Sequence, residues 1–92
     1  MTTFTEESVS PFLDTLKDWH FKENAIEKKF KFKNFTQALG FIVQVGVLAE
    51  RMNHHPELYN VYSKVKIRLN THDSGGVTTK DIELAGQIEN LF

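Results

Sequence analysis

Three of the four histidines in this 92-residue chain stand where an imidazole could take part in proton transfer. His54 and His55 are adjacent, and Pro56 after them ends any helix that precedes it. His72 follows a segment with the composition of a β-strand. Imidazole has an ordinary pKa of about 6.5, which suits proton transfer near neutral pH. The pattern therefore indicates general acid and base chemistry, provided that the fold brings His54 and His55 to His72.

Each of these signals also has a plainer interpretation. His54 and His55 can simply end a helix before Pro56, and for such a triplet alone this is the more frequent reason. A metal site is a further alternative, but adjacent side chains diverge, and no HExxH spacing is present. The residues available to a metal ion would be Glu50, His54, His55, His72 and Asp73.

The composition limits the class of protein. A chain of 92 residues forms one domain, 1–92. Eleven basic and twelve acidic residues give a net charge of −1, which argues against a protein that mainly grips a phosphate backbone. Lys and Phe nearly alternate over residues 28–33, as in some RNA-binding strands, but an amphipathic strand with Phe inward explains this more simply. We therefore expect no direct contact with nucleic acid.

The chain has no segment that predicts secretion or a membrane partner. No run approaches the roughly 18 uninterrupted apolar residues of a membrane span. Residues 1–7 lack the basic and apolar regions of a signal peptide. There is no cysteine for a disulfide framework or a thiolate zinc site. These features together predict a cytoplasmic protein.

Short helices are expected at the two ends of the chain. The first opens at Thr5, whose hydroxyl can cap a turn rich in acids. Pro11 must then either kink this helix or restart it, with Ser10 as the new cap. The last helix opens at Thr78, with Asp81 three positions later.

A long helix is expected over residues 35–52, directly before the paired histidines. Asn34 and Gln37 resemble a capping box at its start. Its apolar residues form one continuous stripe, and further apolar residues lie outside that stripe. In a chain this short, the second apolar face is expected to pack against another copy, giving a dimer or tetramer. The stripe comprises residues 35, 38, 39, 42, 45, 49 and 52, and the residues outside it are Phe41, Val43, Val47 and Leu48.

Strands are expected on both sides of that helix. Residues 19–21 and 25–32 are separated by the turn chemistry of residues 22–24. Residues 58–71 form either one long bent strand or two strands joined by a tight turn near residue 63. The strands are amphipathic, which favours an α+β fold with an antiparallel sheet covered by helices on one face.

Several of these segments, taken together, resemble the pterin-4a-carbinolamine dehydratase family. The likeness covers nearly the whole chain and rests on residues 50–57, 59–62, 71–73 and 75–78 with Asp81. It implies a four-stranded antiparallel sheet with three helices on one face, in the order α-β-β-α-β-β-α, so that residues 58–71 hold two strands. It also implies a hydro-lyase that converts 4a-hydroxytetrahydropterin to quinonoid dihydropterin, without a metal or redox cofactor. That reaction recycles the pterin used by aromatic amino-acid hydroxylases.

The resemblance also implies roles for individual residues. His54 and His72 would be the acid/base pair around the C4a hydroxyl and the ring nitrogen, and His55 would position the substrate and share in proton transfer. Asp81 and Glu50 would orient the imidazoles or tune their charge. The residues implied to contact the substrate are Glu50, Pro56, Asn70, Thr71 and Asp73.

The same family leaves a non-catalytic alternative open. Some relatives act as dimerisation cofactors for a transcription factor, or as assembly factors, through the helical face. The intact His54, His55 and His72 favour the enzyme, and the outer face of residues 35–52 suits both functions. The enzyme hypothesis makes one spatial demand: the end of that helix and the end of the strand before Asp73 must lie beside the same pocket.

Overall fold

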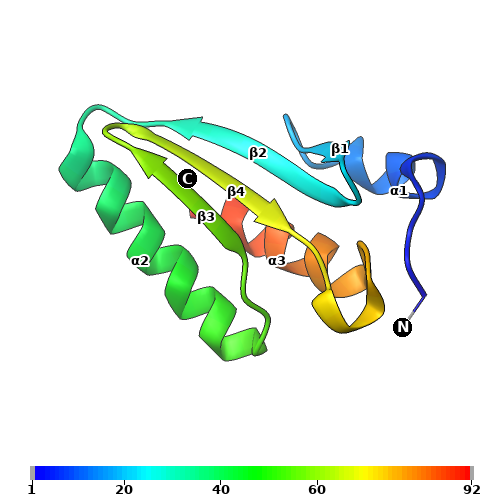
Figure 1. The fold of residues 1–92 in the computed structure, drawn as a ribbon. Coiled ribbons are helices and arrows are strands. Elements are labelled where there is room, and N and C mark those ends of the chain that lie inside the picture. The colour runs from blue at the N-terminus through cyan, green and yellow to red at the C-terminus, as the bar shows by residue number, and fades with distance from the viewer. Residues whose placement is uncertain (1, 92) are drawn as a thin grey trace.

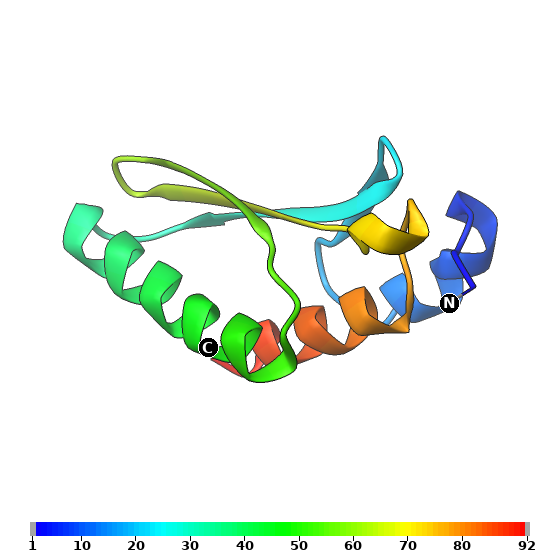
Figure 2. The same ribbon diagram turned by 60° about the horizontal axis from the view of Figure 1, so that its bottom comes forward.

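The computed structural model describes residues 2–91, and it confirms the predicted α+β class and order of elements. The elements are α1 (Glu6–Leu13), β1 (His20–Lys22), β2 (Ala25–Lys31), α2 (Phe35–Met52), β3 (Glu57–Val61), β4 (Lys64–Leu69), the 3₁₀ turn η1 (His72–Ser74) and α3 (Thr79–Glu89). All strand pairs are antiparallel, in the order β1-β2-β4-β3 (Figure 1). Figure 2 shows the helices gathered on one face of this sheet and the opposite face uncovered.

The core lies between the sheet and the helices. Alternation along β4 buries Val65, Ile67 and Leu69 on the helical side. In register with them on β2 lie Phe30 and Ile26, which are also buried. Each such side chain contributes about 1.5–3 kcal/mol by leaving water. These central strands therefore form the rigid base from which the site is built.

Helix α1 begins with Thr5 as its N-cap. The Ser8 N–H donates to the Thr5 hydroxyl at 3.1 Å, and the Thr5 N–H donates to the Ser8 hydroxyl at 2.8 Å. Pro11 lies inside the helix instead of restarting it, and the helix ends soon afterwards at Leu13. The missing N–H of Pro11 removes only the bond to the Glu7 carbonyl, one turn earlier, and the Asp14 N–H still donates to the Ser10 carbonyl at 3.1 Å.

Helix α2 is apolar on two faces, as predicted, but the predicted core stripe is only partly right: Ala38, Val45 and Ala49 are buried, while other members of the stripe are not. Phe41, expected outside the stripe, is only 5% exposed, whereas Phe35 and Leu39, expected within it, are 47% and 43% exposed. Both faces carry large apolar side chains, so periodicity alone did not select the inner one. Phe41 packs on Phe30 and Phe32, with ring centroids 4.8 and 4.9 Å apart, and these contacts set the phase. The buried residues of α2 are Ala38, Phe41, Val45 and Ala49.

The two predicted capping boxes have different outcomes. At α3 the box is complete, with Thr78 as N-cap and the Asp81 carboxylate accepting the Thr78 N–H. At α2 only half of it forms: Asn34 accepts the Gln37 N–H, but the Gln37 side chain accepts the N–H of Lys33 instead of Asn34. Within residues 2–91, no helix combines the length and apolar character needed to cross a bilayer.

Tight turns join the strands of both hairpins. Glu23 and Asn24 have φ values of 49° and 62°, the left-handed pair that a two-residue hairpin turn requires. Residues 58–71 contain two strands, β3 and β4, which turn at Tyr62 with φ 50°. Val61 does not share the burial of Ser63. The turn lies between them, which leaves Val61 75% exposed on the uncovered face.

Candidate active site

The end of α2 turns His54 into the interior. Asn53 adopts a left-handed conformation, φ 51° and ψ 44°, and the His54 N–H donates to the Ala49 carbonyl at 3.0 Å. This is the reversal that glycine or asparagine commonly makes at a helix end. It sends the two neighbouring imidazoles into different surroundings, since the His54 side chain is 8% exposed and the His55 side chain 57%.

The His54 imidazole is held by the fully buried carboxylate of Asp81. His54 Nε2 lies 2.5 Å from Asp81 Oδ1. Asp81 Oδ2 accepts the Thr78 N–H at 2.8 Å and the Thr71 hydroxyl at 2.9 Å. Because a carboxylate only accepts hydrogen bonds, the hydrogen in the first bond belongs to His54 Nε2. Nδ1 of His54, which has no partner among residues 2–91, is therefore the ring nitrogen left for proton exchange.

The His55 imidazole makes a similar bond in water. Its Nε2 lies 2.5 Å from Oε1 of Glu50, whose side chain is 79% exposed. An exposed pair of this kind contributes little to stability, because solvent screens it and both side chains lose freedom. Glu50 therefore biases the direction of His55 without fixing it.

His72 lies in η1, directly after β4. The Thr71 N–H donates to the Gly76 carbonyl at 2.8 Å, and the Thr71 carbonyl accepts the N–H groups of Ser74 and Gly75. These bonds fix the backbone of the loop. The His72 side chain is exposed, and its imidazole has no hydrogen-bond partner among residues 2–91. Both of its ring nitrogens are available to a ligand.

The turn between β1 and β2 supports the loop that carries His72. The Asn24 amide donates to the Gly75 carbonyl at 2.5 Å, and the Asn24 carbonyl accepts the Asn70 amide at 2.9 Å. The backbone also approaches closely here: a Cβ on Gly76 would lie 3.1 Å from Oδ1 of Asn24. A glycine at position 76 therefore lets the two loops touch.

His54, His55 and His72 line one cavity. It has a volume of about 250 Å³ and lies where the end of α2, the end of β4 and the start of α3 meet. An adjoining hollow of about 370 Å³ shares His55, Asn70 and His72 and adds Glu57 and Arg68. The ends of the helix and the strand thus lie beside the same cavity, as the enzyme hypothesis demands. The lining residues of the first cavity are Asn53, His54, His55, Asn70, Thr71, His72, Asp73 and Lys80.

Comparison with known proteins shows what this arrangement belongs to. The family model of pterin 4 alpha carbinolamine dehydratase matches residues 2–91. The chain belongs to that family. A relative from Prochlorococcus marinus (strain NATL2A) is 44% identical over 95% of this chain and 92% of its own length. A relative from Sulfurisphaera tokodaii is 43% identical over 100% and 99%.

A solved structure extends the comparison to the fold. The crystal structure of a transcriptional coactivator/pterin dehydratase from Brucella melitensis has a TM-score of 0.92 and 37% identity, and the match covers 98% of each chain. Together with the full-length relatives, it makes this chain a dehydratase, a member of the hydro-lyases.

The dehydratase cavity also shows where sequence reasoning was incomplete. Glu50 reaches the cavity only through the imidazole that it bonds, and Pro56 is not among the lining residues. Asp81 is not among the lining residues either, but it holds His54. Asn53 and Lys80 line it although sequence reasoning did not select them. Lys80 directly precedes Asp81 at the predicted helix start, a signal that could have drawn attention to it.

Beside the cavity, Arg68 holds two carboxylates. Its Nη1 donates to Glu27 Oε2 at 2.7 Å, and its Nε donates to Glu57 Oε2 at 3.4 Å. The hydrogen bond to Glu27 raises the pKa of the Arg68 guanidinium. Burial alone would raise the pKa of Glu27, but the hydrogen bond and positive charge of Arg68 outweigh it and lower that pKa. On this side of the site, the charge of Arg68 is therefore paired with the carboxylates of Glu27 and Glu57.

The geometry gives the metal alternative no set of ligands. Across residues 2–91, no three His, Cys, Asp or Glu side chains converge closely enough to hold one ion. His54 and His55 instead bond separate carboxylates, those of Asp81 and Glu50.

Proposed function

We propose that this dehydratase removes water from a 4a-hydroxytetrahydropterin by histidine acid/base catalysis at the cavity described above, giving quinonoid dihydropterin. One observation supports this most strongly: three imidazoles from two distant segments line one small cavity. The family to which the chain belongs supplies the substrate class.

The proposed reaction needs two proton transfers. In a carbinolamine, the lone pair of the neighbouring ring nitrogen drives out the hydroxyl group on C4a. An acid protonates the departing oxygen, so that it leaves as water, and a base takes up the proton of the nitrogen. Two imidazoles of opposite protonation state can serve both steps, and their positioning contributes about 10²–10⁴-fold to the rate.

We assign the acid/base pair to His54 and His72. His54 is fixed by Asp81 and keeps Nδ1 for proton exchange, and His72 has both ring nitrogens available. His55, exposed and loosely held by Glu50, positions the substrate and shares in proton transfer. The buried imidazole of His54 is thus held in one orientation, whereas the exposed imidazoles of His55 and His72 can reorient when the substrate binds.

The remaining polar groups of the cavity suit the edge of a pterin. That edge presents amino and ring N–H groups, which require acceptors. The amide oxygen of Asn70 and the carboxylate of Asp73 are acceptors in the lining, and both belong to the proposed substrate contacts. The hydroxyl and N–H of Thr71 are used within the fold, so its proposed role is to hold the loop in its binding conformation. Pro56 contributes by fixing the chain beyond His55.

The proposal is tested by following the dehydration of 4a-hydroxytetrahydropterin spectroscopically. We expect His54→Ala and His72→Ala to lower kcat by about 10²–10⁴-fold, and His55→Ala mainly to raise KM. His20→Ala is the matched control, because His20 is exposed on β1 and does not line the cavity. Full activity in all three site variants would refute acid/base catalysis by these residues. Activity lost to a chelator and restored by zinc would instead revive the metal alternative.

The proposed physiological role is recycling of the pterin used by aromatic amino-acid hydroxylases, in the cytoplasm. A hydroxylase that leaves a 4a-hydroxypterin must be followed by this dehydration before the cofactor can be reduced again. The test is a coupled assay with such a hydroxylase and limiting pterin. Adding the dehydratase should raise steady-state product formation, and no change would contradict the role.

The outer face of α2 supports a dimer or tetramer. Four of its apolar residues recur every four positions and remain between 43% and 66% exposed in a single chain. Burying them against a second α2 would remove this surface from water. These residues are Phe35, Leu39, Val43 and Val47.

Sedimentation of the wild type should show a dimer or tetramer at micromolar concentration. Val43→Asp should shift it toward monomer, and Gln44→Asp, which adds the same charge to the next exposed position, should shift it less. A wild type that sediments only as a monomer would contradict the proposal. The Brucella melitensis protein is described as a coactivator as well as a dehydratase, so the same face is our candidate for a second, non-catalytic binding function.

A further inference from the structure

The uncovered face of the sheet is divided by charge into two halves. Near the dehydratase cavity, Glu27 pairs with Arg68 across β2 and β4, and Glu57 pairs with Arg68 across β3 and β4. Both carboxylates accept hydrogen bonds from the guanidinium. In this half, the guanidinium on β4 thus has a carboxylate beside it on each neighbouring strand.

The other half places lysines directly opposite lysines. Lys29 is the register partner of Lys66, and Lys31 is the register partner of Lys64. Like charges in directly facing positions of a sheet destabilise it. Among residues 2–91, none of these four ammonium groups forms an ion pair with a carboxylate. The fold thus contains two repulsive pairs. In each pair, replacing one lysine with an acidic residue would relieve the repulsion.

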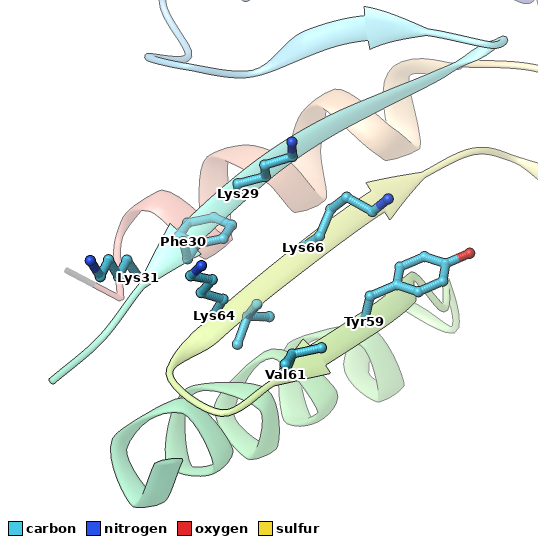
Figure 3. A pocket seen from close by; sticks show the side chains of 8 residues that line it. Lys29, Phe30, Lys31, Tyr59, Val61, Lys64 and Lys66 are labelled. Atoms are coloured by element: carbon cyan, nitrogen blue, oxygen red, sulfur yellow. The ribbon is translucent and has the colours of Figure 1, made fainter. Parts of the chain in front are cut away.

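These lysines surround a hollow on β2, β4 and β3. Its volume is about 440 Å³, and Figure 3 shows the lysines around it with Tyr59 and Val61 at the β3 side. Tyr59 is 48% exposed and Val61 75% exposed. The Nζ of Lys66 lies 4.6 Å from the centroid of the Tyr59 ring. The hollow therefore combines exposed apolar surface with lysines that belong to no ion pair among the described residues.

We propose that this hollow binds an acidic segment of a partner protein in an extended conformation. In an extended chain, side chains two residues apart lie on the same face, about 6.6–6.8 Å from each other. Lys29 and Lys31 have this spacing on β2, as do Lys64 and Lys66 on β4. A segment with carboxylates at alternate positions matches both rows, and an apolar side chain next to them fits Tyr59 and Val61.

The lining favours a peptide over a single-stranded nucleic acid. Binding of single strands relies on aromatic rings on which successive bases stack. Here Phe30 is buried, and the exposed ring, Tyr59, already has the Lys66 ammonium over it. The net charge of −1 also gives no general attraction for phosphate chains.

The like-charge pairs predict opposite effects of one substitution on binding and on stability, which lysines with a purely structural role would not show. Replacing one lysine of each pair should weaken binding and at the same time stabilise the free protein, because repulsion is relieved. We expect Lys29→Gln/Lys31→Gln to raise Tm by about 1–4 °C. A simple loss of folding would move Tm in the opposite direction.

The binding test uses a fluorescein-labelled octapeptide in which Glu alternates with Val and Ser, followed by anisotropy at 50 mM and 300 mM NaCl. We expect saturable binding at the lower salt, weaker binding at the higher salt, and a loss of about fivefold or more in affinity for Lys29→Gln/Lys31→Gln. Lys17→Gln/Arg51→Gln removes the same charge from exposed positions outside the hollow and should change affinity less than twofold.

Further arms of the experiment identify other occupants. Equal binding of a peptide with Gln in place of Glu would overturn the role of charge. Oligothymidylate of twelve nucleotides binding as tightly as the Glu peptide would point to nucleic acid instead.

A change in sedimentation of Lys29→Gln/Lys31→Gln would make the face a contact between copies of this chain. A lower Tm of that variant would contradict the repulsion on which the inference rests. None of the four lysines lines the dehydratase cavity. Peptide binding at the hollow can therefore fail or succeed independently of the proposed dehydration.

Discussion

Two neighbouring histidines make the same bond in opposite surroundings. His54 and His55 each place Nε2 2.5 Å from a carboxylate oxygen. The first pair is buried, at 8% and 0% exposure for His54 and Asp81, while the second is open to water, at 57% and 79% for His55 and Glu50. Burial makes an unpaired partner costly, whereas solvent makes an exposed pair weak. The comparison indicates a fixed imidazole beside an adjustable one.

The largest effect is expected from breaking the buried pair with Asp81→Asn. The amide keeps the shape of the carboxylate but presents an NH₂ group, which cannot accept all three of the hydrogen bonds that Asp81 accepts. We expect His54 to lose its fixed tautomer and kcat to fall by about 10²–10³-fold. We also expect the free energy of unfolding to fall by about 2–4 kcal/mol, as measured by urea titration.

Glu83→Gln provides the control for that variant. It makes the same class of change on the same helix at an exposed position. Both its kcat and its unfolding free energy should stay close to the wild type. If Asp81→Asn kept the kcat and the unfolding free energy of this control, the buried bond between Asp81 and His54 would contribute to neither. Burial would then not distinguish His54 from His55.

A smaller effect is expected from Thr71→Val, which removes one donor to Asp81 without changing the shape of the side chain. The bond from Thr71 to Asp81 Oδ2 measures 2.9 Å, and Thr71 is 7% exposed. Its loss should lower the unfolding free energy by about 1–2 kcal/mol and kcat by only a few fold, because the bond from His54 remains. Thr79→Val, an exposed change on the same loop-to-helix segment, should leave both quantities unchanged. A loss of kcat as large as in Asp81→Asn would mean that Thr71 itself acts on the substrate.

The contrast between the two histidines marks the limit of sequence reasoning. The helix over residues 35–52, the cap at Thr78 and the meeting of His54 with His72 follow from local patterns and the resemblance. Which of two adjacent imidazoles turns inward depends on the left-handed Asn53, and a sequence pattern does not specify that rotation. The placement of Phe41, Phe35 and Leu39 on α2 was mispredicted for a similar reason. Both faces are apolar, and only packing against other elements selects between them.

The lysine-lined hollow illustrates the same limit in the sheet. An amphipathic alternation on each strand was visible in the sequence. The direct opposition of Lys29 and Lys66, however, depends on the register between β2 and β4. Register is set by turns and by the burial of facing side chains, which a single strand does not reveal.

Glu27 lies between the two extremes, being nearly buried but bonded to a charged Arg68. Its pKa is lower in the folded protein than its ordinary value of 4.5, so the ionised carboxylate stabilises the fold above that pH. We expect Glu27→Gln to lower the unfolding free energy by about 1 kcal/mol at pH 7. The difference in unfolding free energy between Glu27→Gln and the wild type should shrink as the pH falls from 7 through the lowered pKa of Glu27. Urea titrations at pH 7 and pH 3 measure it, with the exposed Glu23→Gln as control. A difference that persists at pH 3 would show that side-chain packing, and not charge, is responsible.

The smallest effect is expected from Glu50→Gln, which alters the exposed pair. Because both side chains are largely in water, the unfolding free energy should change by less than about 0.5 kcal/mol. The orientation of His55 should loosen, so KM should rise a few fold while kcat changes little. Higher salt should reduce the difference from the wild type, because it already screens the bond between Glu50 and His55. A fall in kcat comparable to that of Asp81→Asn would mean that exposure does not separate the two histidines, and that both act as fixed catalytic groups.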